Sequence, residues 1–162
     1  MPADDKLFEF ETFPVCSPAL ARDAARLIRI PADLSRHVLL DLDTVRNGRA
    51  WADWPQWFAA MKVRDVTAAG SLRFSHYDQV IHAAIEGGGI AIGKRPHVAR
   101  HLQAGNLVAP LGHAGVARLG AYYVVVSDGA ERDIAHAFVT WLHDEAEQDR
   151  GTVRRKDLTP NA

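Results

Sequence analysis

A hydroxyl, an imidazole and a phenol stand next to one another at Ser75-His76-Tyr77, and all three groups can hydrogen-bond a small polar ligand. The run follows a predicted strand at 72–74 and opens a predicted helix. In open α/β sheets, ligands bind beyond the carboxyl ends of strands, where free helix amides favour an anionic group such as a carboxylate. The alternative is that Ser75 and Asp78 only cap the helix while His76 faces water. The residues alone leave both interpretations open.

Two histidines have the spacing of a metal site. His97 and His101 are one helical turn apart, which can place both imidazoles on one metal ion. The pair encloses no glutamate, as the H-E-x-x-H motif would require, and a third ligand would have to come from elsewhere in the chain. Two solvated histidines on a polar helix face are therefore favoured, and we expect neither a metal nor any other cofactor.

Two further patterns lack a part that their chemistry needs. Gly88, Gly93 and Lys94 match the spacing of a phosphate-binding loop, but Arg95 stands where a Ser or Thr would bind magnesium. The glycines also follow a helix and precede a strand, which reverses the order of a phosphate loop. Cys16 at a strand end is interpreted as a packing residue, because neither a base nor an oxyanion hole is indicated near it. With no G-x-S-x-G motif either, we expect that the chain is not an enzyme.

The composition is that of one ordinary globular domain. The chain has 162 residues, of which 48% are hydrophobic and 24% are charged. Its net charge of -1 argues against a free-standing nucleic-acid binder, which normally carries a basic excess. A single cysteine excludes a disulfide framework, and no apolar run approaches the roughly 20 residues of a membrane span. Because the N-terminus also lacks a basic signal-peptide region, the sequence predicts a soluble, cytoplasmic domain without a membrane partner.

Strands and helices alternate along the chain, which predicts an α/β fold with a mixed, mainly parallel sheet flanked by helices. Apolar runs and turn residues predict strands at 8–16, 38–40, 72–74, 90–92, 107–109 and 121–126. Caps, glycines and prolines predict helices at 18–30, 53–61, 75–86, 96–104 and 130–148. Trp51, Trp54, Phe58 and Met61 recur at helical spacing and are expected in a core or an interface. The polar segment 149–162 is expected to be a disordered tail.

Several runs occur in an order that characterises a known family. They are Phe13-Pro14-Val15-Cys16-Ser17-Pro18-Ala19-Leu20, Arg73-Phe74-Ser75-His76-Tyr77-Asp78-Gln79-Val80-Ile81, Glu86-Gly87-Gly88-Gly89-Ile90-Ala91-Ile92-Gly93, Gly105-Asn106-Leu107-Val108-Ala109-Pro110 and Tyr122-Tyr123-Val124-Val125. Together they resemble the effector-binding domain of LysR-type transcriptional regulators. The serine-histidine-tyrosine-aspartate run is typical of the branch that contains the glycine-cleavage activator. The resemblance extends over about 7–146.

The resemblance implies part of a type 2 periplasmic-binding-protein-like fold. Residues 1–106 would form the second lobe of the effector-binding domain, and 107–148 would be the return segment that belongs to the first lobe. In the family, a helix-turn-helix domain, a linker helix and the first part of lobe I precede this region. We therefore expect a truncated form of a LysR-type regulator.

The implied function is that of a ligand-sensing regulatory domain. Its partner would be a small anionic effector of the carboxylate or amino acid class, and Ser75 matches a position that often holds an effector-contacting hydroxyl. Lys94 and Arg95 could supply positive charge to an acidic effector, although exposed, solvated charges are an equal alternative. The alternative function is a stand-alone dimerisation or interaction module that binds no ligand. The residues expected to bind the effector are Ser75, His76, Tyr77, Arg95 and Pro96.

The resemblance also implies self-association. The segments 107–109 and 121–126 and the helix that carries Ile134, Phe138, Trp141 and Leu142 resemble elements that pack against lobe I. We expect these apolar faces to be buried in a homodimer or higher oligomer, for example by exchange of the last helix, because a two-fold arrangement closes. The alternative is that the terminal segment folds back onto the second lobe.

We predict that this chain alone does not bind duplex DNA. The net charge is -1, and no helix-turn-helix pattern with a basic recognition helix is present in the sequence. Binding through phosphate contacts weakens steeply between about 50 and 200 mM salt. Fluorescence anisotropy of a labelled duplex at both salt concentrations measures this, and affinity that falls with salt would contradict the prediction.

Overall fold

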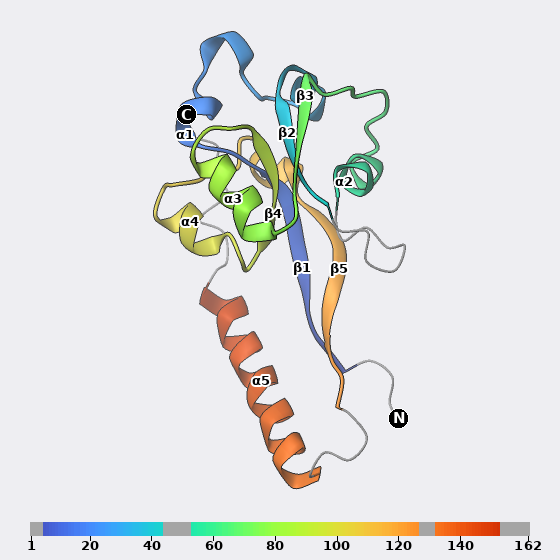
Figure 1. Cartoon of the computed structure of the whole chain (residues 1–162). Coiled ribbons are helices and arrows are strands. Elements are labelled where there is room, and N and C mark those ends of the chain that lie inside the picture. Colours follow the sequence, from blue (N-terminus) through green and yellow to red (C-terminus); the bar gives the residue numbers. More distant parts are fainter. Residues whose placement is uncertain (1–4, 44–52, 127–131, 153–162) are drawn as a thin grey trace.

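A computed structural model describes residues 5–43, 53–126 and 132–152 (Figure 1). The strands are β1 (Asp5–Val15), β2 (Val38–Leu42), β3 (Gly70–Phe74), β4 (Ile90–Arg95) and β5 (Ala117–Val124). The α-helices are α1 (Pro18–Ala21), α2 (Trp54–Ala60), α3 (Tyr77–Ile85), α4 (Ala99–Gln103) and α5 (Arg132–Thr152). Short 3-10 turns lie at Ala24–Arg26, Pro31–Arg36 and Gly112–Gly115. The predicted alternation of strands and helices is therefore confirmed.

The strands form one mixed sheet in the order β3-β2-β4-β1-β5. β2 pairs in parallel with β3 and with β4, whereas β1 pairs antiparallel with β4 and with β5. β1 is therefore the one described strand that runs against the others, as a mainly parallel sheet requires. Because β3, β2 and β4 run the same way, their carboxyl ends meet at one edge of the sheet.

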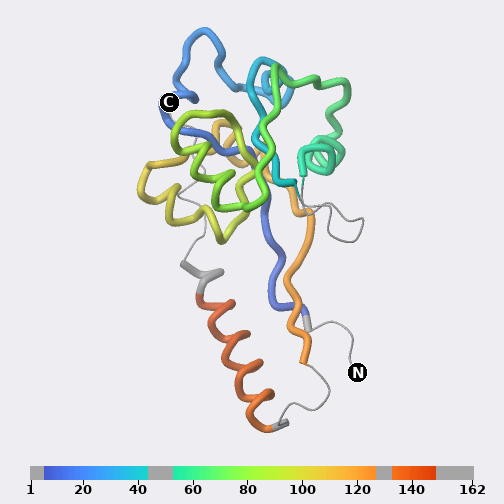
Figure 2. The backbone as a smooth tube through the Cα atoms, in the orientation of Figure 1, coloured from blue at the N-terminus to red at the C-terminus, as the bar shows by residue number. Residues whose placement is uncertain are grey.

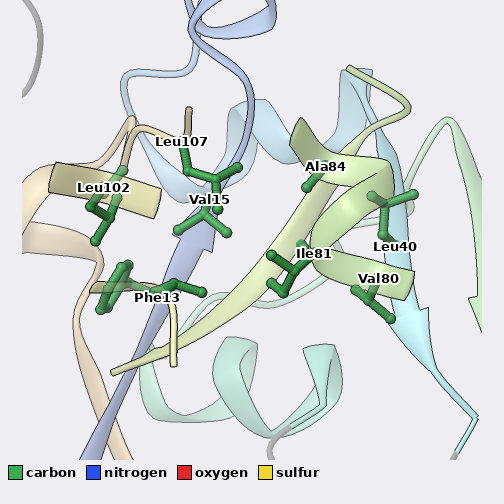
Figure 3. Close-up of a cluster of buried hydrophobic side chains, with 11 residues drawn as sticks. Phe13, Val15, Leu40, Val80, Ile81, Ala84, Leu102 and Leu107 are labelled. Atoms are coloured by element: carbon green, nitrogen blue, oxygen red, sulfur yellow. The ribbon is translucent and has the colours of Figure 1, made fainter. Parts of the chain in front are cut away.

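Each face of the sheet carries its own hydrophobic core, because successive residues of a strand point to opposite faces. Leu40 and Ala91 belong to the cluster under α3 and α4, whereas their neighbours Leu39 and Ile90 belong to the cluster on the opposite face. Figure 3 shows the first cluster, in which side chains from β1, β2 and α3 meet. Its buried members are Phe13, Val15, Leu40, Val80, Ile81, Ala84, Ala91, Val98, Leu102, Leu107 and Ala109.

Two tryptophans of α2 anchor the second cluster. The Trp54 indole nitrogen donates to the carbonyl oxygen of Leu40, and that of Trp57 donates to Gly115, each at 3.0 Å. Both side chains are buried, so the predicted core packing of this aromatic helix is confirmed. The predicted cap is confirmed as well, since the Asp53 carboxylate accepts from the Gln56 amide. Trp51 lies outside the described residues.

The predicted helix at 18–30 is wrong beyond its first turn. Ser17 caps α1 as expected, but the helix ends at Ala21 and a separate 3-10 turn follows. The physical reason is competition from short acidic side chains. The Asp23 carboxylate accepts from the Ala25 amide, and the Asp33 carboxylate accepts from the amides of Arg29 and Ile30. These bonds stabilise turns where the apolar spacing suggested a continuous helix.

Two further boundaries differ from the prediction. The expected strand at 107–109 is reduced to a single bridge between Val108 and Cys16, and the last strand begins at Ala117, earlier than expected. The helix after β4 begins at Ala99, because the chain first makes a turn in which the Val98 amide donates to the Lys94 carbonyl. α3 ends at Ile85, and the predicted glycine stop is confirmed, since Gly87 just beyond the helix has a φ of 82°.

β1 and β5 continue as a two-stranded ribbon beyond the end of β4, and α5 lies beside this ribbon in contact with β1 (Figures 1 and 2). The apolar stripe that is expected to be buried in an oligomer is largely exposed in the single chain. Ile134, Phe138 and Trp141 are 65%, 56% and 53% exposed, and the two aromatic rings stack on each other. The partly buried residues of the helix include Val139 and Leu142.

α5 extends to Thr152, past the expected end at Gln148, and the rest of the expected tail lies outside the described residues. Although α5 has 21 residues, neither it nor any other helix in the described ranges is long and apolar enough to cross a bilayer. β5 forms one edge of the sheet, and Tyr123 near its end is 52% exposed. The ribbon and α5 therefore present an apolar surface and an open strand edge together.

We predict that the protein self-associates through this apolar surface of α5. Complete burial of a large apolar side chain contributes roughly 1.5–3 kcal/mol, so three half-exposed ones favour association by several kcal/mol. Sedimentation velocity at micromolar concentration is expected to show a dimer or larger species. The double variant Phe138→Glu with Trp141→Glu is expected to be monomeric.

The matched control is Thr140→Glu with Gln148→Glu, which adds the same charge at polar positions of α5 and is expected to leave the association unchanged. A wild-type protein that sediments as a compact monomer at every concentration would contradict self-association and would favour the folded-back alternative.

Candidate functional site

The carboxyl ends of β3 and β4 lie on either side of β2, and the sequence places Ser75 directly after β3 and Arg95 at the end of β4. The ladder between β2 and β3 continues to the pair Leu42 and Phe74. The ladder between β2 and β4 stops earlier, at Leu40 and Ala91. The backbone of β4 beyond Ala91 therefore needs another hydrogen-bonding partner on the side of β2.

Tyr77, the first residue of α3, is that partner. Its hydroxyl donates to the Ile92 carbonyl oxygen at 3.1 Å and accepts from the Lys94 amide at 2.8 Å. One side chain thus satisfies the donor and the acceptor that a neighbouring strand would have engaged. Burial raises the pKa of Tyr77, so its hydroxyl remains protonated and able to donate at neutral pH. Tyr77 therefore ties the start of α3 to the end of β4, and it is a positioning residue.

Ser75 and His76 are exposed beside this junction, and the Ser75 hydroxyl oxygen lies 3.2 Å from Nδ1 of His76. The predicted capping box of Ser75 and Asp78 is wrong, because α3 begins one residue later than a cap at Ser75 requires. His76 occupies the cap position, and its side chain makes no capping hydrogen bond. The Ser75 hydroxyl is thus directed to the adjacent imidazole and not to the amides of the helix.

Lys94 is buried, so the alternative of a solvated lysine is wrong. Its side chain is 2% exposed, and its Nζ lies 4.9 Å from the centroid of the Tyr77 ring. The ring face stabilises the ammonium group, but burial opposes it. Burial lowers the pKa of Lys94 to about 8. The His97 ring lies nearby, 5.9 Å from the Tyr77 ring and 6.0 Å from the ring of Tyr122.

Arg95 is also largely buried, with a side chain that is 15% exposed. Its guanidinium carbon lies 5.6 Å from the centroid of the Phe13 ring, and its Nη1 lies 3.8 Å from Oε2 of Glu11. Pro96 follows through a cis peptide bond and is half-buried. The structure therefore brings the candidate residues from β4 and those before α3 to one edge of the sheet, with Tyr77 linking the two groups.

Sequence reasoning missed two acidic residues near this edge. Asp41, in β2, is half-buried and its carboxylate accepts from the Leu42 amide at 3.0 Å. Burial raises its pKa. The sequence feature that could have pointed to Asp41 is the presence of an acidic residue within the apolar run of β2. Glu11, in β1, was hidden because its position fits an ordinary strand alternation.

The other candidate chemistries find little support in the geometry. Cys16 is fully buried and burial raises its pKa to about 12, which confirms packing as its role. His101 lies within α4, whereas His97 lies ahead of that helix. In the described part of the chain, no group of three or more His, Cys, Asp or Glu side chains could hold a metal ion.

Comparison with known proteins identifies similar regulators. The family model described as the LysR substrate binding domain matches residues 4–147. The glycine cleavage system transcriptional activator of Escherichia coli K12 is 30% identical over 151 residues, which cover 93% of this chain and 47% of that protein. The HTH-type transcriptional regulator DsdC of the same strain is 31% identical over 140 residues, covering 86% and 44%. The chain thus spans about half the length of the curated relatives it matches.

Solved structures that are similar to this chain also include a domain of a transcriptional regulator. The effector domain of the transcriptional regulator AmpR of Pseudomonas aeruginosa superposes with a TM-score of 0.66 at 26% identity, covering 92% of this chain and 68% of that one. The second substrate binding domain of a putative amino acid ABC transporter from Streptococcus pneumoniae Canada MDR_19A has a TM-score of 0.52 at 14% identity, covering 96% and 64%. The latter similarity concerns the fold alone.

The burial of Lys94 predicts a specific pH dependence of stability. Its pKa is about 8 in the folded chain and 10.5 when unperturbed, so between these values the unfolded chain holds more protons and stability rises with pH. Below pH 8 the folded chain bears the full free-energy cost of burying the charged Lys94 ammonium. The variant Lys94→Met lacks this dependence. Its stability advantage over wild type is expected to shrink, by on the order of 3 kcal/mol, as the pH rises from 8 towards 10.5.

Denaturant unfolding followed by tryptophan fluorescence measures this difference at each pH. The exposed Lys62, replaced by Met, gives the baseline for removing a lysine charge. A difference between Lys94→Met and wild type that stays constant over this pH range would contradict the burial of the amine.

Proposed function

Because the chain belongs to the LysR substrate-binding domain family, we propose that it senses a small anionic effector on behalf of a transcriptional regulator. The observation that carries this proposal is the junction at Tyr77, which holds an exposed hydroxyl and imidazole next to the cationic end of β4. Such a pairing of neutral donors with desolvated positive charge suits a carboxylate. DNA would be bound by a helix-turn-helix domain outside these 162 residues.

Each candidate residue has a distinct role in this proposal. The Ser75 hydroxyl and the His76 imidazole hydrogen-bond the effector, and the Arg95 guanidinium binds its carboxylate. Tyr77 positions the two groups, and Pro96 shapes the backbone after Arg95. Lys94 adds positive charge from beneath the site, where low local polarity strengthens its attraction for an anion.

The effector class that we propose is that of amino acids and small carboxylates. One relative is named for the activation of glycine cleavage, which connects that protein with amino acid metabolism. In the proposed effector site, the carboxylate of the ligand would bind Arg95. Its ammonium group would donate to an acidic side chain, for which the half-buried Asp41 at the same edge is the candidate.

The division of the chain is part of the proposal. Residues 1–106 form the second lobe, and 107–148 are the segment that returns to the first lobe. The pairing of β5 with β1 and the exposed side of α5 support this division, because both leave surfaces that a first lobe would cover. As part of a regulator that acts on DNA, the domain is assigned to the cytoplasm.

A second candidate function is a dimerisation or interaction module that binds no small molecule. The exposed apolar surface of α5 favours it, since such a surface marks an interaction site. The two functions differ in one measurement, the thermal stability of the protein in the presence of candidate effectors.

We expect a thermal-shift screen of amino acids and small carboxylates to yield at least one stabilising ligand. A ligand at 100 times its dissociation constant stabilises the folded state by roughly 2.7 kcal/mol. For that ligand, Ser75→Ala is expected to weaken binding by about 0.5–1.5 kcal/mol, the net value of one hydrogen bond. Because Ser75 does not cap α3, its replacement is expected to leave the stability of the free protein nearly unchanged.

Titration calorimetry measures the two affinities, with Ser71→Ala as the control. Ser71 is an exposed serine near the start of β3, the strand that Ser75 follows, where it is paired with Leu39 and lies away from the carboxyl edge. Equal affinities for wild type and Ser75→Ala would refute the role of Ser75. A screen without any stabilising ligand would favour the interaction module.

A further inference from the structure

Glu11 of β1 lies between two arginines on one face of the sheet. In the register of the sheet it is the partner of Arg95 in β4 and also of Arg118 in β5. Directly opposed residues of neighbouring strands point to the same face, so the three side chains form a row across β4, β1 and β5. One carboxylate therefore serves two guanidinium groups, and the row carries one positive charge in excess.

The two contacts of Glu11 are unequal. Its Oε1 accepts a hydrogen bond from Nη2 of Arg118 at 3.3 Å, whereas its Oε2 lies 3.8 Å from Nη1 of Arg95. The longer distance exceeds that of a hydrogen bond, so this contact is a charge attraction without a shared proton. The weaker contact is also the more buried one, since Arg95 is 15% exposed and Arg118 is 67% exposed. Glu11 thus neutralises Arg95 without matching its hydrogen-bonding geometry.

A carboxylate that reached Arg95 from outside could approach it with better geometry. Guanidinium and carboxylate groups form paired, parallel hydrogen bonds when both are free to align. Glu11 is fixed by its strand and by Arg118, whereas a small ligand has no such restraint. Arg95 is held in place by the Phe13 ring below it and by the backbone that Tyr77 secures.

We propose that Glu11 is an internal competitor for Arg95, so that an anionic effector binds by taking the place of its carboxylate on this guanidinium. Glu11 then retains Arg118 as its partner, and the charge link between β4 and β5 through β1 is released. The affinity for the effector is set by the difference between the external and the internal carboxylate. This inference rests on the proposed function, because it names the residue that tunes that same site.

The test uses acetate as the probe and the whole 162-residue chain as the protein. Acetate is titrated at constant ionic strength while NMR follows the Nε–H signal of the Arg95 side chain. The variant Glu11→Gln removes the internal charge and is expected to bind acetate about two- to fivefold more tightly, as the value of a partly exposed ion pair indicates. Arg118→Gln leaves Glu11 with Arg95 alone and is expected to bind acetate more weakly by a similar factor.

Two controls separate competition from a general change in charge. Glu9→Gln removes a carboxylate of the same strand that pairs with Lys6 and is 51% exposed, and it is expected to match wild type. In the double variant Glu11→Gln with Arg118→Gln, the effect of the Arg118 substitution is expected to disappear, because it acts through Glu11. Should Glu11→Gln fail to fold, Glu11→Asp withdraws the carboxylate from Arg95 and is expected to tighten binding in the same direction.

The outcomes are distinct. Acetate affinities that are equal in wild type, Glu11→Gln and Glu9→Gln would overturn the competition while leaving the effector site intact. An Arg95 signal that acetate shifts in none of the variants would remove Arg95 from the site. The proposed function itself would fail only if the effector screen also found no ligand.

Discussion

The bond between the Tyr77 hydroxyl and the backbone of β4 is the contact on which the candidate site depends. Where β2 and β4 separate, β4 would otherwise expose a carbonyl and an amide inside the protein, which is costly for any buried backbone. A phenol satisfies both groups because its oxygen can donate and accept at once. The same contact fixes the start of α3 and therefore the positions of Ser75 and His76. It also fixes the backbone from which Lys94 and Arg95 extend. The sheet can thus open at this edge without losing the order of the residues around the opening.

Electrostatics gives that edge its character. Lys94 and Arg95 are largely removed from water, and each lies against an aromatic ring, Lys94 against Tyr77 and Arg95 against Phe13. A ring face compensates only part of the hydration that a cation loses. The Glu11 carboxylate lies 3.8 Å from the Arg95 guanidinium, which is longer than a hydrogen bond. This edge of the sheet thus gathers two largely buried cationic side chains, and the family to which the chain belongs uses this type of domain to recognise effectors. A modest overall charge is consistent with this picture, because the positive potential is local.

The two ends of the molecule differ in how completely they are packed. Around α2, α3 and α4, both faces of the sheet are covered and two hydrophobic clusters are closed. Along the ribbon of β1 and β5, α5 contacts β1, and large apolar side chains of α5 remain exposed. Surface of this kind costs free energy in water, so a partner that covers it gains what the isolated chain forgoes. The candidate site lies at the boundary between these two ends, where Glu11 of β1 contacts both Arg95 of β4 and Arg118 of β5.

Local patterns determined a large part of this protein. The apolar runs specified β2, β3 and β4, the glycines after α3 specified its end, and the Asp53 cap and the spacing of Trp54 specified α2. The order of the motifs identified the family, because a set of short runs in sequence is specific even when each run is weak. Tertiary structure decided the rest. No local pattern reveals that the Tyr77 hydroxyl reaches Ile92 and Lys94, that Lys94 is buried, or that Glu11 meets Arg95 and Arg118, since these contacts join separate helices and strands. Periodicity also could not predict which side of α5 faces β1. An apolar stripe indicates that a helix is covered, but it does not indicate which surface covers it.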